Sequence, residues 1–253
     1  MQIRPRPSLR HRPDIWGPGR TLAFGVAIAA AFLLVQLGVI FACALYEVEH
    51  GQQTSVRAAA AGLSDNGLVF SLATVASAGA CTVCTWGAAR LRKGSDPADY
   101  LGMHRVPARA LMAWLAVTLA LMAVSDLVEP LIRNPQGPEF TLSLYRSATL
   151  APLFWFAIVI AAPVFEELFF RGFLLQGLRW SRLGPVAAVI LTALAWALSH
   201  AQYSRPEVAE IFIFGLFLGM ARLRTDSIYP PIAMHAFVNL ATLIQAAMVV
   251  GSH

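Results

Sequence analysis

Residues 163–177 read PVFEELFFRGFLLQG, an apolar run that encloses two adjacent glutamates and an arginine. A charged side chain in such a run is costly to bury, so it must be paired or used. The run belongs to an apolar segment over residues 148–178, which is longer than the roughly 20 residues needed to cross a bilayer. We therefore interpret this segment as a transmembrane helix and treat its charged residues as candidates for function.

The whole chain has the composition of a membrane protein. Of its 253 residues, 57% are hydrophobic and only 13% are charged, whereas soluble domains carry about 25% charged residues. We expect an all-α, polytopic transmembrane helix bundle that forms a single domain over residues 21–250. It would have about seven spans, or eight with one further segment, at residues 21–46, 67–89, 108–127, 148–178, 184–203, 207–223 and 229–250.

The distribution of basic residues predicts the orientation in the bilayer. Residues 1–20 contain five arginines and four prolines and read as a disordered basic arm. Loop 90–107 is also basic, whereas loop 47–66 has one arginine against three acidic residues. Because cytoplasmic loops are enriched in Lys and Arg, we expect a cytoplasmic N-terminus in a bacterial inner (plasma) membrane. This topology accounts for the net charge of +5, and the chain lacks the basic stripe with interleaved aromatics that would indicate nucleic-acid binding.

The two glutamates are predicted to have different roles. Glu167 and Arg171 are four residues apart, so they share a helix face and can form an ion pair. Glu166 is rotated by about 100° from Glu167 and has no obvious local partner. We predict that Glu167 is structural and that Glu166 faces a pocket, where a carboxylate can serve as a general base.

Two further pairs of polar residues lie in later segments, again at a spacing of four. Trp196 and His200 place an indole next to an imidazole, and His235 and Asn239 place an imidazole next to a carboxamide. Each pair shares one helix face. A histidine within a span is a candidate for function by the same reasoning as the glutamates.

The spacing around one turn predicts that these groups meet. Glu166 lies 17 residues before residue 183, and His200 lies 16 residues after residue 184. In an antiparallel hairpin that turns there, both side chains would lie at a similar depth. We expect His235 to join them in a pocket near the cytoplasmic side.

The order Glu-Glu-x-x-x-Arg, aromatic-x-x-x-His and His-x-x-x-Asn on separate membrane helices resembles the CPBP family, the CAAX proteases and bacteriocin-processing enzymes that are also called the Abi family. The resemblance covers residues 150–245, and EELFFRGFLLQGL and PPIAMHAFVNL are particularly similar to its first and last motifs. Trp196 stands where the family usually has Phe. An aromatic residue there preserves the wall of the pocket but changes its shape.

The resemblance implies an intramembrane endopeptidase that hydrolyses a peptide bond of a membrane-associated or lipidated protein or peptide. It also implies roles for four residues. Glu166 with His200 would activate a water, and His235 with Asn239 would stabilise the oxyanion. Trp196, Glu167 and Arg171 would support them.

The residues alone leave the metal dependence and two other functions open. Glu166, His200 and His235 are valid Zn²⁺ ligands, but the chain has no HExxH motif, so we favour hydrolysis without a metal or other cofactor and keep zinc as the alternative. The same pocket could hold a peptide without cutting it, as in an immunity-type membrane protein. Buried Glu and His also form proton relays in coupled transporters. The complete Glu/His/His/Asn set favours catalysis.

Overall fold

A computed structural model of the chain describes residues 15–63, 65–132 and 139–251, and all regular structure among them is helical. The first half contains α1 (Pro18–Glu49), α2 (Val56–Leu63), α3 (Gly67–Arg90), α4 (Pro97–Leu101), α5 (Ala108–Ile132) and α6 (Glu139–Ser147). The second half contains α7 (Ala151–Phe156), η1 (Ala157–Ala161), α8 (Ala162–Glu166), η2 (Glu167–Leu174), α9 (Leu175–Arg179), α10 (Gly184–Leu198), α11 (Arg205–Thr225) and α12 (Tyr229–Gly251).

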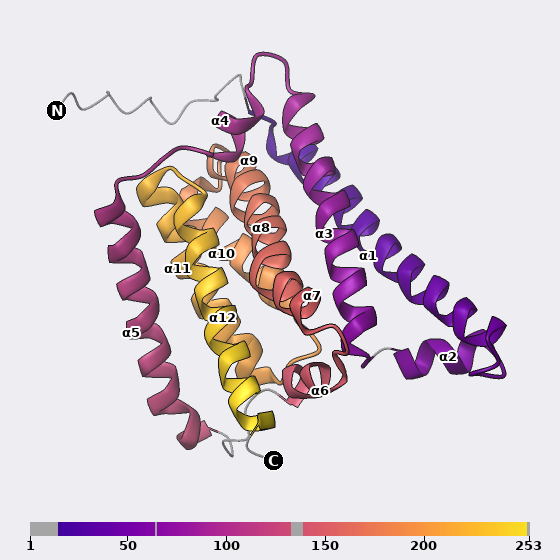
Figure 1. Ribbon diagram of the computed structural model, residues 1–253. Coiled ribbons are helices and arrows are strands. Elements are labelled where there is room, and N and C mark those ends of the chain that lie inside the picture. Colours follow the sequence, from indigo (N-terminus) through magenta and orange to yellow (C-terminus); the bar gives the residue numbers. More distant parts are fainter. Residues whose placement is uncertain (1–14, 64, 133–138, 252–253) are drawn as a thin grey trace.

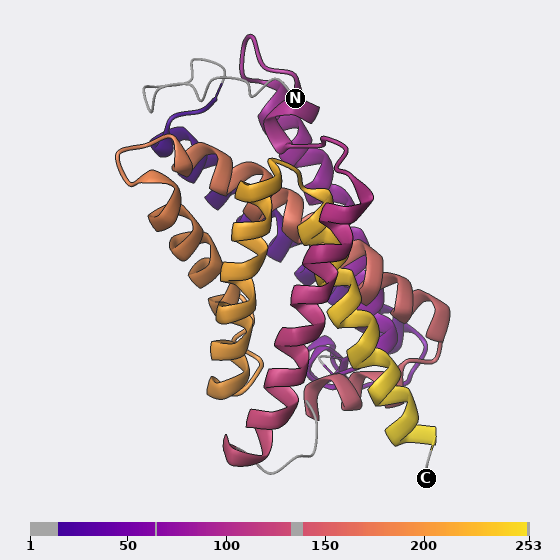
Figure 2. The ribbon, with the colours of Figure 1, turned by 90° about the vertical axis from the view of Figure 1, so that its left-hand side faces the viewer.

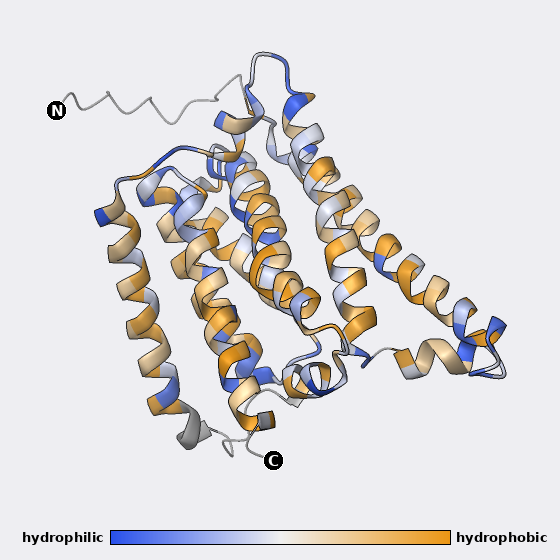
Figure 3. Ribbon diagram, in the orientation of Figure 1, coloured by the Kyte–Doolittle hydropathy of each residue, from blue (hydrophilic) through white to orange (hydrophobic). Residues whose placement is uncertain are grey.

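The long helices run up and down along one common direction, while α2 and α6 lie across it at the lower end of Figure 1. The first residues of α1 and the last residues of α12 lie at opposite ends of the molecule (Figures 1 and 2). Hydrophilic residues gather mainly at the two ends, and the middle of the bundle is largely apolar (Figure 3). This is the distribution that a bilayer requires of a polytopic protein.

Among the described residues, five helices are long and apolar enough to cross a membrane: Pro18–Glu49, Gly67–Arg90, Ala108–Val128, Ala151–Arg179 and Tyr229–Gly251. The two other expected spans, 184–203 and 207–223, are not among them. The expected span 184–203 ends early, because α10 has 15 residues, about 22 Å of helix at 1.5 Å per residue. The expected span 207–223 lies in α11, which carries charged residues toward both ends, among them Glu207, Glu210 and Arg222.

The fourth of these helices, Ala151–Arg179, is one continuous rod that contains two π-helical segments, η1 and η2. In η1 the amide of Ala162 donates to the carbonyl of Ala157, five residues earlier. Pro163 follows at once; in an α-helix its ring would clash with the carbonyl four residues before it. The wider turn accommodates the proline, and such π-bulges are frequent at functional sites.

Burial separates an inner from an outer layer of helices. In the most apolar stretch of α3 and of Ala151–Arg179, 44% of residues are buried, against 6% in α1 and in α5. The exposed side chains of α1 and α5 are apolar, which suits a lipid-facing surface; they include Leu34, Leu37, Phe41, Met112, Leu119 and Leu127. The inner helices therefore hold the polar side chains away from lipid.

Close packing of the inner helices depends on small residues. A Cβ atom at Gly177 of α9 would overlap the side chain of Thr21 on α1. At Gly219 of α11 a Cβ would come within 2.8 Å of Val189 on α10. Small residues at such crossings let membrane helices approach closely, which fixes α9 against α1 and α11 against α10.

The predicted N-terminal arm ends earlier than expected. Residues 1–14 lie outside the described residues. Ile15 is buried, Trp16 donates from its indole nitrogen to the carbonyl of Ala88 at 2.8 Å, and α1 begins at Pro18 rather than near residue 21. The end of the predicted arm is thus anchored to the end of α3.

Candidate active site

The polar side chains of the second half converge on Trp196, near the end of α10. Its indole nitrogen donates a hydrogen bond to Oε2 of Glu166. Its ring lies edge-on to the rings of both His200 and His235, with 5.2 Å between centroids in each case. The guanidinium carbon of Arg171 lies 4.4 Å from the centroid of the same ring, a cation–π distance. Trp196 therefore lies between two groups of ionisable side chains.

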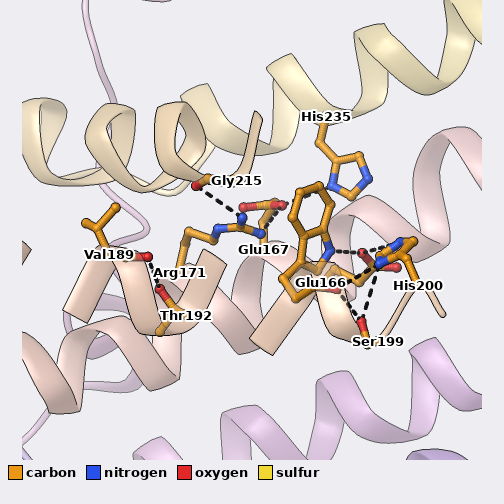
Figure 4. Close-up of polar contacts among 10 residues, drawn as sticks. Glu166, Glu167, Arg171, Val189, Thr192, Ser199, His200, Gly215 and His235 are labelled. Atoms are coloured by element: carbon orange, nitrogen blue, oxygen red, sulfur yellow. Dashed lines mark hydrogen bonds and ion pairs between the residues drawn. The ribbon is translucent and has the colours of Figure 1, made fainter. Parts of the chain in front are cut away.

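The first group is Glu166 with His200. Nε2 of His200 lies 4.0 Å from Oε2 of Glu166, and the two side chains are 20% and 19% exposed. This separation is too long for a direct hydrogen bond. It leaves both groups able to contact the same small polar molecule. Figure 4 shows the two side chains facing each other.

The proton position on His200 follows from its other contact. Nδ1 of His200 lies 2.8 Å from the backbone carbonyl of Trp196. A carbonyl oxygen only accepts, so Nδ1 carries the hydrogen. In the neutral imidazole, Nε2 then presents its lone pair toward Glu166. The site thus places a carboxylate and an imidazole acceptor side by side.

The second group is Glu167 with Arg171 and His235. Oε1 of Glu167 accepts from Nη1 of Arg171 at 2.9 Å and lies 2.9 Å from Nδ1 of His235. Glu167 and Arg171 are fully buried. Nη2 of Arg171 donates to the carbonyl of Gly215 on α11 at 3.4 Å (Figure 4). The carboxylate thus joins three helices: its own, α11 through Arg171, and α12 through His235.

Glu167 also fixes the ring of His235. A carboxylate paired with arginine is an acceptor only, so Nδ1 of His235 is its donor. Nε2 of His235 points away from this bond. A carboxylate behind an imidazole fixes its tautomer and the orientation of its ring. Glu167 therefore positions His235 as well as pairing with Arg171, a contact that the sequence-based prediction did not include.

Asn239 has a different neighbour from His235, although the two share one face of α12. Nδ2 of Asn239 donates to the backbone carbonyl of Ile158, in η1, at 2.8 Å. The amides that would normally reach this carbonyl cannot do so. Ala162 bonds to Ala157 instead, and Pro163 has no N–H. Asn239 therefore satisfies a backbone acceptor that the π-turn and the proline leave without a partner.

Tyr203 completes the surroundings of His200. It lies in the connection between α10 and α11, with its ring stacked at 6.1 Å from that of His200. The same ring meets Phe140 of α6 edge-on at 5.5 Å, and the phenol lies 3.5 Å from the hydroxyl of Thr141. Because burial raises the pKa of the Tyr203 phenol, it stays protonated and able to donate.

The sequence-based predictions hold for three contacts. The Glu167–Arg171 ion pair is confirmed, Trp196 lies beside His200, and the hairpin brings Glu166 and His200 together. Glu166 does have a neighbour, the indole of Trp196, which the prediction treated only as a wall. Trp differs from the Phe expected there by one N–H donor. This difference in the sequence could have indicated a contact of Trp196 with Glu166.

The zinc alternative does not fit the arrangement. Among the described residues, no group of three or more His, Cys, Asp or Glu side chains is arranged to hold a metal ion. His235 directs Nδ1 to Glu167, and the ring of Trp196 stands next to both histidines. Three protein ligands around one open position, as catalytic zinc requires, are not brought together.

The second half of the chain matches a known protein family. Residues 148–241 match the model of a family described as type II CAAX prenyl endopeptidase Rce1-like. An Escherichia coli protein named "Uncharacterized 24.3 kDa protein" is 29% identical over 182 residues, which cover 69% of this chain and 78% of that protein. No solved structure matches the chain. The matched segment contains every residue of both ionisable groups, so residues 148–241 form a domain of the Rce1-like type II CAAX prenyl endopeptidase (CPBP) family.

Proposed function

We propose that this protein is an intramembrane endopeptidase that hydrolyses a peptide bond of a membrane-associated or lipidated protein or peptide. The observation that carries the proposal is the pair formed by Glu166 and His200. Their facing atoms lie 4.0 Å apart, and the Nδ1 contact of His200 leaves Nε2 directed at the carboxylate. A water between them would have two acceptors for its protons, which is the requirement for general-base activation.

In the proposed reaction the water attacks the carbonyl carbon of the scissile bond while Glu166 takes one of its protons. The carbon–nitrogen bond then breaks, and the protonated Glu166 returns that proton to the leaving amine. His200 holds the water and orients its second hydrogen. The indole of Trp196 donates to Oε2 of Glu166, the oxygen that faces His200, and a carboxylate oxygen keeps a second lone pair that can take the proton.

The developing negative charge on the carbonyl oxygen needs hydrogen-bond donors. His235 would take this role as an imidazolium, with the hydrogen on Nδ1 donated to Glu167 and a second hydrogen on Nε2 directed at the oxyanion. Asn239 donates one amide hydrogen to the Ile158 carbonyl. Its second amide hydrogen would donate to the oxyanion. No step requires a metal, in keeping with the poor fit of the side chains to a zinc site.

Comparative membrane proteomics tests the proposal. Cells that carry the wild-type chain are compared with cells that carry Glu166→Gln. Glu49→Gln, an exposed carboxylate at the end of α1, is the matched control. We expect cleaved forms of one or more membrane proteins to vanish with Glu166→Gln and to persist with Glu49→Gln. An unchanged set of cleavage products in a well-expressed Glu166→Gln strain would contradict the proposal and favour a peptide-binding role for the same pocket.

A further inference from the structure

A cavity of about 370 Å³ lies where α1 begins, at the end of the bundle that also holds the end of α3 (Figure 1). Its described lining consists of residues 15–20 and of Arg92, which follows α3 by two residues. The volume is within the range of ligand-binding pockets, about 300–1,000 Å³. No residue of the candidate active site belongs to this described lining, so the cavity is a separate feature of the molecule.

Trp16 forms a wall of this cavity and holds two arginines beside it. Its indole nitrogen donates to the carbonyl of Ala88 at 2.8 Å, which fixes the ring against α3. The guanidinium carbon of Arg20 lies 5.4 Å from the centroid of the ring, and that of Arg92 lies 5.2 Å from it. Both are cation–π distances. One aromatic ring thus gathers a cation from α1 and a cation from the segment after α3.

The described lining is positively charged. It contains two arginines and no acidic residue, and the first turn of α1 has no acidic residue either. Two cations that share one ring repel each other, so an anion between them would be stabilised by both. The planar guanidinium group matches a phosphate with two parallel hydrogen bonds. A phosphate-type anion is therefore the class of ligand that this cavity fits best.

The position of the cavity favours a phosphate that belongs to a lipid. Both α1 and α3 are long and apolar enough to cross a membrane, and the cavity lies where α1 starts and α3 has ended. Directly after the cavity, α1 exposes the apolar side chains of Leu22 and Val26. Tryptophan and arginine are typical of the level at which hydrocarbon gives way to headgroups. A phospholipid in the surrounding bilayer therefore presents its phosphate at the level of Arg20 and Arg92.

We propose that this cavity binds the phosphate of an anionic phospholipid, with the guanidinium groups of Arg20 and Arg92 on the phosphate. The apolar part of the lining, Ile15, Trp16 and Pro18, contacts the glycerol part of the headgroup. Basic pockets between transmembrane helices bind such headgroups in other membrane proteins. The lipid joins the start of α1 to the end of α3 and neutralises the two cations. This binding requires no catalysis and is independent of the proposed endopeptidase function.

Lipid retention by the purified full chain tests the proposal. The chain is immobilised in a neutral detergent through a tag after residue 253 and equilibrated with micelles that contain phosphatidylglycerol or phosphatidylcholine with the same acyl chains. Bound lipid is then extracted and measured as a function of lipid concentration. The variants are Arg20→Gln alone and Arg20→Gln with Arg92→Gln. The matched control is Arg90→Gln with Lys93→Gln, two exposed basic residues at the same end of α3 that do not line the cavity.

We expect the wild-type chain to retain phosphatidylglycerol in preference to phosphatidylcholine. A basic residue near an anionic headgroup strengthens binding about fivefold. Arg20→Gln should therefore weaken retention of phosphatidylglycerol about fivefold and the double variant roughly 25-fold, while the control pair leaves it nearly unchanged. Because Arg20 is exposed, its single variant keeps the fold and gives a result even where the double variant does not fold.

Equal retention of the two lipids, or equal losses in the cavity and control variants, would overturn the proposal. So would release of the lipid by millimolar inorganic phosphate but not by chloride of equal ionic strength, because the cavity would then bind a free anion. Unchanged retention in both cavity variants would also overturn it. The two guanidinium groups would then pair with a carboxylate of the chain, such as that of Asp14, two residues before Trp16 in the sequence.

Discussion

At the scale of single residues, the site depends on one aromatic side chain with a polar edge. Trp196 donates to Glu166 with its indole nitrogen and contacts Arg171 with its ring face. Tryptophan combines a large apolar surface with a single donor, so one residue both separates the two ionisable groups and orients the proposed base. Phenylalanine could do only the first.

Replacing Trp196 with Phe tests this double role. Trp196→Phe keeps an aromatic ring against Arg171 but removes the donor to Glu166. A hydrogen bond to a charged group contributes about 1.5–3 kcal/mol, so we expect turnover of a substrate found by the proteomic comparison to fall roughly tenfold to hundredfold. Turnover equal to that of the wild type would show that the indole N–H does not act on Glu166.

The adjacent glutamates should respond differently to the same change. Glu167→Gln leaves the fully buried Arg171 without its charge partner, and losing one partner of a buried ion pair costs about 3–5 kcal/mol. Glu166→Gln keeps an acceptor for Trp196 and should leave the free energy of unfolding near that of the wild type, while turnover is abolished. Unfolding in detergent and turnover are measured for both variants; equal stability of the two would contradict the separate roles.

At the scale of elements, the helix Ala151–Arg179 carries the site because its regular hydrogen bonding is interrupted. The π-turn η1 and Pro163 leave the Ile158 carbonyl to the side chain of Asn239. A buried carbonyl without a donor is costly, so this contact ties α12 to the helix of the glutamates. It also holds His235, one turn earlier on α12, against Glu167.

A double-mutant cycle measures this tie. Asn239→Ala should lower the free energy of unfolding by about 1–3 kcal/mol, the cost of an unsatisfied buried polar group. Pro163→Ala restores a backbone N–H next to the π-turn. We expect Asn239→Ala to cost less in the Pro163→Ala background than in the wild type, as read from detergent unfolding of all four chains. Strictly additive effects would mean that the carbonyl contact does not stabilise the helix.

The turn between α11 and α12 is held to α9 by charge. The carboxylate of Asp226 accepts from Arg179 at 3.0 Å and from Arg222 at 2.9 Å. Burial alone would raise the pKa of the Asp226 carboxyl, but the two guanidinium groups outweigh burial and lower it. Asp226 also has a φ of 49°, a left-handed conformation that Asn and Asp adopt more readily than most residues.

This lowered pKa predicts how stability depends on pH. The unfolded chain has an aspartate pKa of about 3.9, so the stabilisation from Asp226 is present above that pH and is lost as the pH falls through the lower pKa of the folded state. Asp226→Asn keeps the left-handed turn but removes the charge. We expect the variant to be less stable at neutral pH and to lose less stability than the wild type on acidification. Parallel curves of melting temperature against pH would contradict this role.

At the scale of the whole molecule, the arrangement gathers basic turns at one end. The start of α1 lies at the same end as the turns after α3, α9 and α11, and the end of α12 lies at the opposite one (Figure 1). Because charge at short loops determines orientation, this distribution of charge predicts a cytoplasmic N-terminus.

Reporter fusions test the orientation independently of the site. A reporter fused before Met1 should be active only in its cytoplasmic form, and one fused after residue 253 only in its exported form. The reason is the concentration of Lys and Arg around the turns after α3, α9 and α11, at the end of the bundle where α1 begins. An exported reporter before Met1 would contradict this orientation.

The sequence by itself determined the helical membrane class and most of the candidate site. Composition and the length of apolar runs suffice for the class, because a bilayer admits few kinds of structure. The spacing of four identified Glu167 with Arg171, and the symmetric spacing about the turn at residues 183–184 identified Glu166 with His200. These contacts are local along one helix or one hairpin, so the spacing of residues in the sequence is enough to predict them.

Only the tertiary structure decided how the helices meet and where each one ends. Helix α10 ends at Leu198, short of the predicted end at residue 203, so that His200 lies in the segment after the helix. The bond of Asn239 to Ile158, and that of His235 to Glu167, join residues 81 and 68 positions apart. Such contacts depend on how α12 packs and rotates against a helix with π-turns. No periodic pattern in the sequence predicts that packing or that rotation.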